Sequence, residues 1–284
     1  MKKHVKRLLL FFIAVPAIVA IILLLPHKNH LIINIFSIVF SGLGAGELAN
    51  ILKEREHGIS KTQATILGGL GPFAATLSVS FNFSQELIPL AYFLSACFVM
   101  TTWIFTGGKK ITFICDRVIC GFSIILYPGF FMIWLIRIGG LPMSSYIIIV
   151  FLLVVFGSDA WAWVTGMLFG KGNRGIIAVS PQKSIAGFIG SYMAAIFFAV
   201  TPVFLLPGAF TSPHLPSPLA GVLLGIFTGS AAILGDLAES ALKRGSNVKD
   251  SGSIIPGRGG VLDSIDSIAI AAPVFYYLYL LLFL

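Results

Sequence analysis

The densest group of chemically active residues in this chain lies between positions 235 and 266, GDLAESALKRGSNVKDSGSIIPGRGGVLDSID. These 32 positions hold five of the eleven acidic and four of the nineteen basic side chains, although 57% of the chain is hydrophobic. Charge beside a bilayer is costly, so such a concentration indicates a functional site. The residue types are those that bind a metal ion and a nucleotide at a membrane surface.

The first part of this stretch is predicted to continue a membrane helix. Spacings of three, four and seven residues place four polar side chains on one helix face: Asp236, Glu239, Ser240 and Lys243. A simple ion pair between Glu239 and Lys243 at an ordinary helix end would explain this face equally well. The residues that follow favour a site instead.

The segment KDSGSIIPGRGG contains five Gly and Pro residues, which predicts an irregular loop whose backbone N–H groups can approach phosphates. Asp263 and Asp266 then recur three positions apart as the chain enters its last apolar segment. Mg²⁺ binds a few carboxylates together with phosphate oxygens, and cationic side chains offset the remaining phosphate charge. The cations in this stretch are Lys243, Arg244, Lys249 and Arg258.

A second polar group lies upstream, in SDAWAWVTGMLFGKGNRGIIAVSPQKSIAG. Asp159 falls inside an apolar segment, and an intramembrane carboxylate needs a partner or water, so we expect it to face the interior. Trp161 and Trp163 are more typical of an interfacial belt than of a base-stacking platform. The Gly-rich loop with Lys171 and Lys183 suits phosphate binding, although it matches no P-loop spacing.

These groups must be positioned by a helical bundle in a membrane. A charged fraction of 11% and a mean hydropathy of +0.97 exclude an ordinary soluble domain. We predict an all-α, polytopic membrane protein with about nine transmembrane helices and two regions, 1–110 and a catalytic 111–284. The predicted spans are 8–25, 31–51, 63–81, 87–106, 111–136, 143–168, 186–206, 218–241 and 266–284.

The distribution of Lys and Arg predicts the orientation. With the N-terminus in the cytoplasm and the C-terminus outside, sixteen of the nineteen cations fall in cytoplasmic segments and two, Lys28 and Arg137, in outer ones. Arg117 lies near the inner end of the fifth span. The charged stretch therefore faces the cytoplasm from the cell membrane, and the net charge of +8 also suits anionic lipids and substrates. Glu47, near the end of the second span, is predicted to be interfacial or to line a substrate path.

The segments GDLAESALKR, KDSG, PGRGG and LDSID resemble the C-terminal signature of the phosphatidate cytidylyltransferases, or CDP-diacylglycerol synthases. SDAWAWVTGMLFGK and SPQKSIAG are similar to the upstream motif of that family. The resemblance covers about the last 125 residues, whereas the N-terminal half agrees in its span pattern and in Glu47. It implies transfer of CMP from CTP to phosphatidate, giving CDP-diacylglycerol and pyrophosphate for phospholipid biosynthesis.

The resemblance also assigns roles to residues. It places Mg²⁺ on Asp236 and Asp263, allows a second, monovalent cation, and adds Lys249 and Asp250 to the catalytic group. A homodimer follows from the resemblance alone, and no nucleic-acid partner is expected. The substrate-binding set is Asp159, Ser180, Lys183, Ser184, Glu239, Ser240, Lys243, Arg244, Gly257, Arg258, Gly259, Gly260 and Asp266.

Three positions depart from the family pattern. Arg258 replaces the His of PGHGG, Ser264 replaces the Arg of LDRxD, and Ala186 replaces a Glu in SPxK(S/T)xEG. We hypothesise that Arg258 supplies the cation missing at 264, and loss of turnover in a folded Arg258→Ala variant would test this. Without a His at 258, catalysis must rest on a metal and on positioning, which suffices because the phosphate of phosphatidate is already an anionic nucleophile.

Alternative functions stay open at this point. Intramembrane carboxylates also occur in cation-coupled transporters, but the acidic residues here cluster at the predicted cytoplasmic edge and no internal repeat is visible. A catalytically silent relative that binds CTP or lipid, or an altered member that uses another lipid phosphate, has the same sequence features. Incubation with labelled CTP and phosphatidate separates these alternatives.

Overall fold

The computed structural model describes residues 3–53, 59–104, 114–255 and 259–284. Across these ranges the chain forms helices and no strand, so the predicted all-α class is confirmed. The helices are α1 (Lys3–Leu24), α2 (His27–Lys53), α3 (Lys61–Phe81), α4 (Leu87–Thr101), α5 (Ile114–Ile124), η2 (Ile125–Phe130), α6 (Ile133–Gly139), α7 (Ser144–Leu152), η3 (Leu153–Gly157), α8 (Ser158–Phe169), α9 (Ile185–Leu205), α10 (Pro207–Phe210), α11 (Ser217–Gly245) and α12 (Leu262–Phe283).

Seven helical segments of the described chain are long and apolar enough to cross a membrane. Two shorter apolar helices, Ile13–Leu24 and Leu87–Thr101, coincide with the first and fourth predicted spans. The polytopic membrane class is therefore confirmed, while the total of nine and the orientation of the termini stay predictions. The seven segments are His27–Leu52, Lys61–Phe81, Ile114–Gly139, Ser144–Phe169, Ile185–Leu205, Ser217–Gly245 and Leu262–Phe283.

The chain divides into two compact units. The first comprises Met1–Gly140 and Leu242–Ile265, and the second comprises Leu141–Ala241 and Asp266–Leu284. Both α11 and α12 pass from one unit into the other. The N-terminal helices thus belong to the same unit as the motif loop between α11 and α12, and the division into regions 1–110 and 111–284 stays a prediction.

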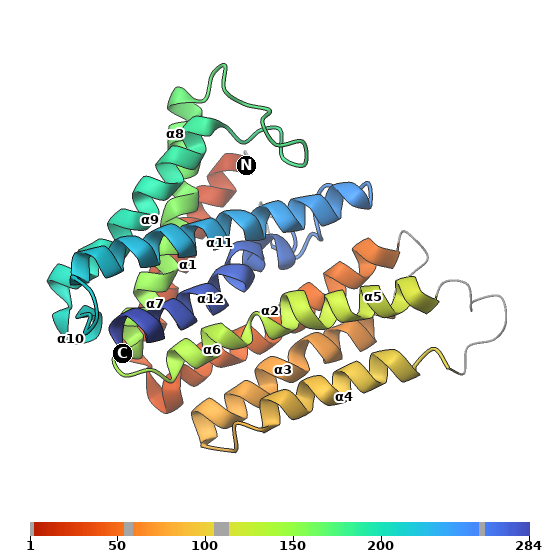
Figure 1. Ribbon diagram of the computed structural model, residues 1–284. Helices are drawn as coiled ribbons and strands as arrows, with labels where there is room; N and C mark the ends of the chain where they lie inside the picture. Colours follow the sequence, from red (N-terminus) through yellow and green to blue (C-terminus); the bar gives the residue numbers. More distant parts are fainter. Residues whose placement is uncertain (1–2, 54–58, 105–113, 256–258) are drawn as a thin grey trace. The chain divides into compact units, whose positions relative to one another are not determined.

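Close helix packing in the first unit is centred on α2 and α3, which run side by side (Figure 1). Asn34 of α2 donates to the Ser80 hydroxyl at 3.0 Å, which joins the start of one helix to the end of the other. A Cβ on Gly68 would overlap Ala45, so a small residue at this position allows the two helices to approach closely. Ser60 begins α3 with a capping box.

A π-helical segment, η2, interrupts the helix that runs from α5 to α6. It contains Pro128, and proline favours an irregular helix because it cannot donate the backbone hydrogen bond of a regular helix. The Ser41 hydroxyl of α2 donates to the Pro128 carbonyl, so a neighbouring side chain binds this irregular backbone.

In the second unit, α8 and α9 pack closely along a glycine-containing surface (Figure 1). A Cβ on Gly187 would lie 3.0 Å from the Ala162 carbonyl oxygen. At the other end of the unit, Tyr279 of α12 donates to the Ala209 carbonyl at 2.6 Å. Trp161 and Trp163 are 51% and 64% exposed on α8, and their place in an interfacial belt stays a prediction.

Candidate functional site

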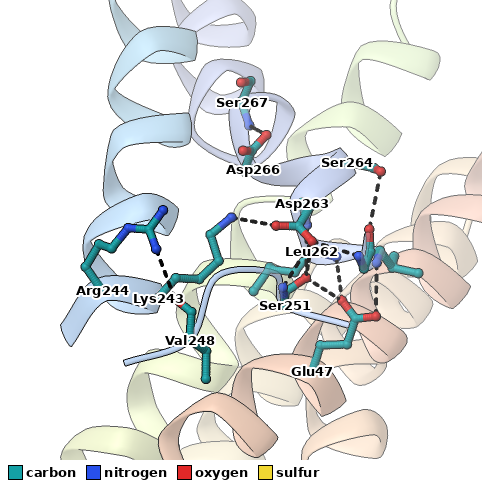
Figure 2. Close-up of polar contacts among 12 residues, drawn as sticks. Glu47, Lys243, Arg244, Val248, Ser251, Leu262, Asp263, Ser264, Asp266 and Ser267 are labelled. Carbon is teal, nitrogen blue, oxygen red and sulfur yellow. Dashed lines mark hydrogen bonds and ion pairs between the residues drawn. The ribbon is translucent and has the colours of Figure 1, made fainter. Parts of the chain in front are cut away.

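The motif loop of the first unit folds around two carboxylates, Glu47 and Asp263 (Figure 2). The loop leaves α11 after Gly245 and reaches α12 at Leu262. Near its end, Ile255 and Gly259 exchange two backbone hydrogen bonds of 2.8 and 3.0 Å. Gly259 has a φ of +117°, a conformation that favours glycine over residues with a side chain.

Asp263 is fixed by hydrogen bonds to both of its oxygens. Oδ2 accepts from the Ser251 backbone N–H at 3.0 Å, the Ser251 hydroxyl at 2.9 Å and the Gly260 N–H at 2.7 Å. Oδ1 accepts from Lys243 Nζ at 2.5 Å, and the two paired side chains are only 8% and 11% exposed. The structure therefore brings three predicted site residues together: Lys243, Gly260 and Asp263.

Glu47 of α2 is the second carboxylate of this group, and it is 3% exposed. Its Oε1 accepts from the Val261 N–H at 3.0 Å, and its Oε2 accepts from the Leu262 N–H at 2.8 Å and the Ser251 hydroxyl at 2.9 Å. The first backbone N–H groups of a helix have no hydrogen-bond acceptor within it, and Glu47 supplies acceptors for those at the beginning of α12.

The contribution of Glu47 and Ser251 was missed by the sequence reasoning, which predicted only an interfacial or path-lining Glu47. The available indication was an acidic residue inside a predicted span after a run of small residues, SGLGAGE. Ser251 gave no such indication, because a serine in a polar loop is common. A hydrogen-bond partner more than two hundred positions away cannot be read from periodicity.

The structure also corrects one expectation about the loop backbone. Its amides were expected to be free for phosphates, yet those of Ser251, Gly260, Val261 and Leu262 all donate to Glu47 or Asp263. These four N–H groups hold carboxylates because the loop bends around two acidic side chains.

The other predicted residues of the loop lie at or near the surface. Arg244, Lys249 and Asp250 are exposed, and Arg244 Nη1 lies 3.5 Å from the Val248 carbonyl oxygen. Gly257 and Arg258 lie outside the described residues, so the proposed charge exchange between positions 258 and 264 stays a prediction. Ser264 is half-buried, and its hydroxyl lies 3.4 Å from the Gly260 carbonyl oxygen.

The second unit contains a further ion pair between predicted site residues. Lys183 Nζ lies 2.6 Å from Asp236 Oδ2, and these side chains are 23% and 33% exposed. Lys183 comes from the loop after α8, whereas Asp236 lies on α11. The upstream motif and the C-terminal motif are thus in direct contact within one unit, as the resemblance requires of residues that act together.

The loop that carries Lys183 is held by its own hydrogen bonds. Ser184 caps α9, because its hydroxyl accepts from the Gly187 N–H at 3.1 Å. Arg174 Nη2 donates to the Gly166 carbonyl at 3.1 Å, and the Ser180 carbonyl accepts from the Lys183 N–H at 3.1 Å. Ser180 and Ser184 therefore shape this loop in addition to any role in binding.

The remaining predicted residues of the second unit are partly or fully buried. Ser267 lies between two of them: its hydroxyl is 3.5 Å from Asp159 Oδ2, and its N–H donates to Asp266 Oδ1 at 2.6 Å. Asp266 is 7% exposed and Glu239 is 1% exposed, while Ser240 is half-buried. The expectation that Asp159 faces other helices agrees with its contact with α12.

Within the described ranges, no group of three or more His, Cys, Asp or Glu side chains is placed to hold a metal ion. Mg²⁺ is nonetheless commonly bound by one or two carboxylates, with water and substrate phosphates as the other ligands. Asp236 and Asp263 each have a lysine ammonium at 2.6 and 2.5 Å, so a cation already lies against each carboxylate. A metal ion at either carboxylate would share or replace this lysine, so the predicted magnesium site on Asp236 and Asp263 stays a prediction.

The apolar helices define a polytopic membrane protein, and each of its two units has a lysine–aspartate pair on the loops or ends of its helices. The profile of the Cytidylyltransferase family matches residues 5–282, so the chain belongs to this family.

Several relatives carry the name phosphatidate cytidylyltransferase. That of Bacillus subtilis (strain 168) is 30% identical over 247 residues, which are 86% of this chain and 88% of the relative. That of Staphylococcus saprophyticus is 29% identical over 260 residues, which are 90% of this chain and 94% of the relative. That of Aquifex aeolicus is 28% identical over 206 residues, which are 72% of this chain and 70% of the relative. The predicted family is confirmed, and the match extends well beyond the last 125 residues, to the helices of the N-terminal half.

Proposed function

We propose that this protein transfers CMP from CTP to phosphatidate and forms CDP-diacylglycerol and pyrophosphate. The observation that carries this proposal is the match to phosphatidate cytidylyltransferases over as much as 90% of the chain. The ion pairs of Lys183 with Asp236 and Lys243 with Asp263 support it, because motif residues far apart in sequence are in contact.

In the proposed reaction, a phosphate oxygen of phosphatidate attacks the α-phosphorus of CTP. The bond from this phosphorus to the oxygen that bridges the α- and β-phosphates breaks, and pyrophosphate leaves with that oxygen. The attacking phosphate is already anionic, so the chain needs no side chain to remove a proton. Its task is to align the two phosphates and to stabilise negative charge.

Cationic side chains are the groups suited to this task. Lys183 and Lys243 are already held at defined positions by their aspartates, and a phosphate oxygen can share the remaining protons of each ammonium group. Arg244, in the last turn of α11, and Lys249, in the motif loop, are exposed and can meet the outer phosphates or the lipid headgroup. Asp250, exposed beside Lys249, is proposed to orient that lysine.

Magnesium is part of the proposal, with Asp236 and Asp263 as its ligands. When bound, Mg²⁺ would supply positive charge to the phosphoryl oxygens of CTP. We expect turnover to cease after chelation by EDTA and to return with added Mg²⁺. A second, monovalent cation belongs to the same proposal and would appear as a dependence of turnover on K⁺ or Na⁺.

The site is proposed to face the cytoplasm, with CTP arriving from that side and phosphatidate from the inner leaflet. The excess of Lys and Arg in predicted cytoplasmic segments supports this orientation. A single cysteine introduced at the exposed Lys249 should react with an impermeant thiol reagent only when the cytoplasmic face is accessible. Homodimer formation is proposed from the family resemblance, and mass measurement of the detergent-solubilised protein tests it.

The decisive experiment is incubation of the purified, detergent-solubilised protein with CTP labelled at its α-phosphate and with phosphatidate. We expect label in an organic-extractable CDP-diacylglycerol and an equal amount of pyrophosphate. Label in another lipid phosphate, but not in phosphatidate, would identify an altered acceptor. A folded protein that labels no lipid would overturn the proposal.

A further inference from the structure

Glu47 lies on α2, in the N-terminal half of the chain, yet its contacts are with the C-terminal motif loop. We propose that Glu47 is a positioning residue that holds Asp263 in its working orientation. This inference rests on the proposed function, because it gives Glu47 a role in the nucleotidyl transfer. It also makes a separate prediction about the loop itself.

The first link joins Glu47 to the beginning of α12. Its two oxygens accept the N–H groups of Val261 and Leu262 at 3.0 and 2.8 Å, and the Glu47 side chain is 3% exposed. A buried charge that accepts hydrogen bonds at both oxygens has one favourable orientation. The end of the loop, one residue before Asp263, is therefore fixed to α2.

The second link runs through Ser251. Its hydroxyl oxygen lies 2.9 Å from Glu47 Oε2 and 2.9 Å from Asp263 Oδ2, and it accepts from the Asp263 N–H at 3.3 Å. Because a hydroxyl has a single proton, it donates to one carboxylate at a time, but its oxygen stays between the two. The position of Glu47 is thereby coupled to that of the Asp263 side chain.

The loop is seated directly on Glu47, with no space for an intervening side chain. A Cβ on Gly252 would lie 2.5 Å from Glu47 Oε1, and one on Gly260 would overlap both Ser251 Oγ and Glu47 Oε2. The three donors to Asp263 Oδ2 come from this same segment, and they leave Oδ1 directed at Lys243. Displacement of the segment therefore changes the direction of Asp263 Oδ1.

The test compares Glu47→Gln and Glu47→Asp with the wild type. The glutamine keeps the size but places an NH₂ group against backbone donors, whereas the aspartate keeps two acceptor oxygens on a shorter side chain. A displacement of about 1 Å at a catalytic group can cost about a hundredfold in rate. For Glu47→Gln we expect kcat to fall at least about tenfold, KM for phosphatidate to change less than about twofold, and half-maximal activation to require more Mg²⁺. Glu47→Asp should recover part of kcat.

Glu86→Gln serves as the matched control, because Glu86 is an exposed acidic residue of the same unit that precedes α4. Hydrogen exchange of a peptide that contains Val261 and Leu262 gives a readout independent of turnover. We expect exchange of these amides to accelerate at least about tenfold in Glu47→Gln, and not in Glu86→Gln, because one acceptor oxygen is lost and the charge of the carboxylate is removed.

Two results would overturn the proposal. Unchanged exchange in Glu47→Gln would show that Glu47 does not hold the loop, whether or not the protein turns over. Accelerated exchange with a wild-type kcat and Mg²⁺ requirement would show that Glu47 serves the fold alone. If the wild type itself transfers no CMP, the proposed function fails on that measurement, which is distinct from both of these.

Discussion

Replacement of Asp263 by Asn tests whether this carboxylate carries the chemistry. Asp263 has three donors on Oδ2 and the Lys243 ammonium on Oδ1, and an amide has only one oxygen to offer them. If that oxygen stays with the loop donors, the NH₂ group faces Lys243 Nζ at a distance where two donors repel. The variant therefore loses the ion pair and keeps, at best, neutral versions of the other hydrogen bonds.

The expected loss of unfolding free energy in Asp263→Asn follows from the burial of its ion pair with Lys243. The Lys243 and Asp263 side chains are 11% and 8% exposed, so water screens their attraction little. Loss of one partner from a buried pair costs about 3–5 kcal/mol, and we expect about 3 kcal/mol because the lysine can turn toward the exposed part of the loop. Turnover should fall at least about a hundredfold, as expected when a charge at the reacting phosphates is removed.

The assay measures initial rates of CDP-diacylglycerol formation at saturating CTP, together with thermal unfolding of the same preparation. Titration with Mg²⁺ should not restore the rate, because the ligand itself is missing. Glu86→Gln, at the exposed glutamate that precedes α4, is the control and should retain both rate and stability. A folded Asp263→Asn variant with a near-normal rate would refute the assignment of Asp263 to the metal and to catalysis.

Three further substitutions separate structural from chemical roles. Gly260→Ala places a Cβ against Ser251 Oγ, so it should lower the unfolding free energy by about 1–3 kcal/mol, and an unchanged melting temperature would contradict the packing described above. Lys183→Met removes a pair with Asp236 that is 23% and 33% exposed, so stability should change by less than about 1 kcal/mol. Its rate should nevertheless fall at least about tenfold, and a rate equal to the wild type would exclude Lys183 from phosphate binding. Ser184→Ala removes the side-chain cap of α9 and should lower the unfolding free energy by about 1 kcal/mol. Unchanged thermal unfolding would show that Ser184 does not stabilise α9 as a cap.

The helices could be predicted because continuous apolar segments leave few alternatives in a chain of this composition. The seven candidate membrane helices and two shorter apolar ones fall on the nine predicted segments. The irregular segment η2 contains Pro128, a residue type that favours a break in a regular helix. The second π-helical segment, η3, contains no proline, so no residue type in it distinguished it from a regular helix.

The partners of the charged residues were much less predictable. Periodicity places Asp236 on a helix face, but it does not identify Lys183, 53 positions earlier, as the partner. Glu47 and Val261 are separated by 214 positions, and only the fold of the first unit brings them together. Sequence patterns could therefore name most candidate residues, while the assignment of donors to acceptors required the structure.

The hydrogen bonds made by its backbone N–H groups change the expected role of the Gly-rich loop. Phosphates are commonly bound by amides at the beginning of a helix, and α12 begins at this loop. Here the Val261 and Leu262 amides donate to Glu47, and the Gly260 amide donates to Asp263. A phosphate at these amides would have to displace a buried carboxylate of the same charge, which is unfavourable. These amides are thus committed to holding Glu47 and Asp263, and we propose that the CTP phosphates are recognised by cationic side chains and by the metal ion.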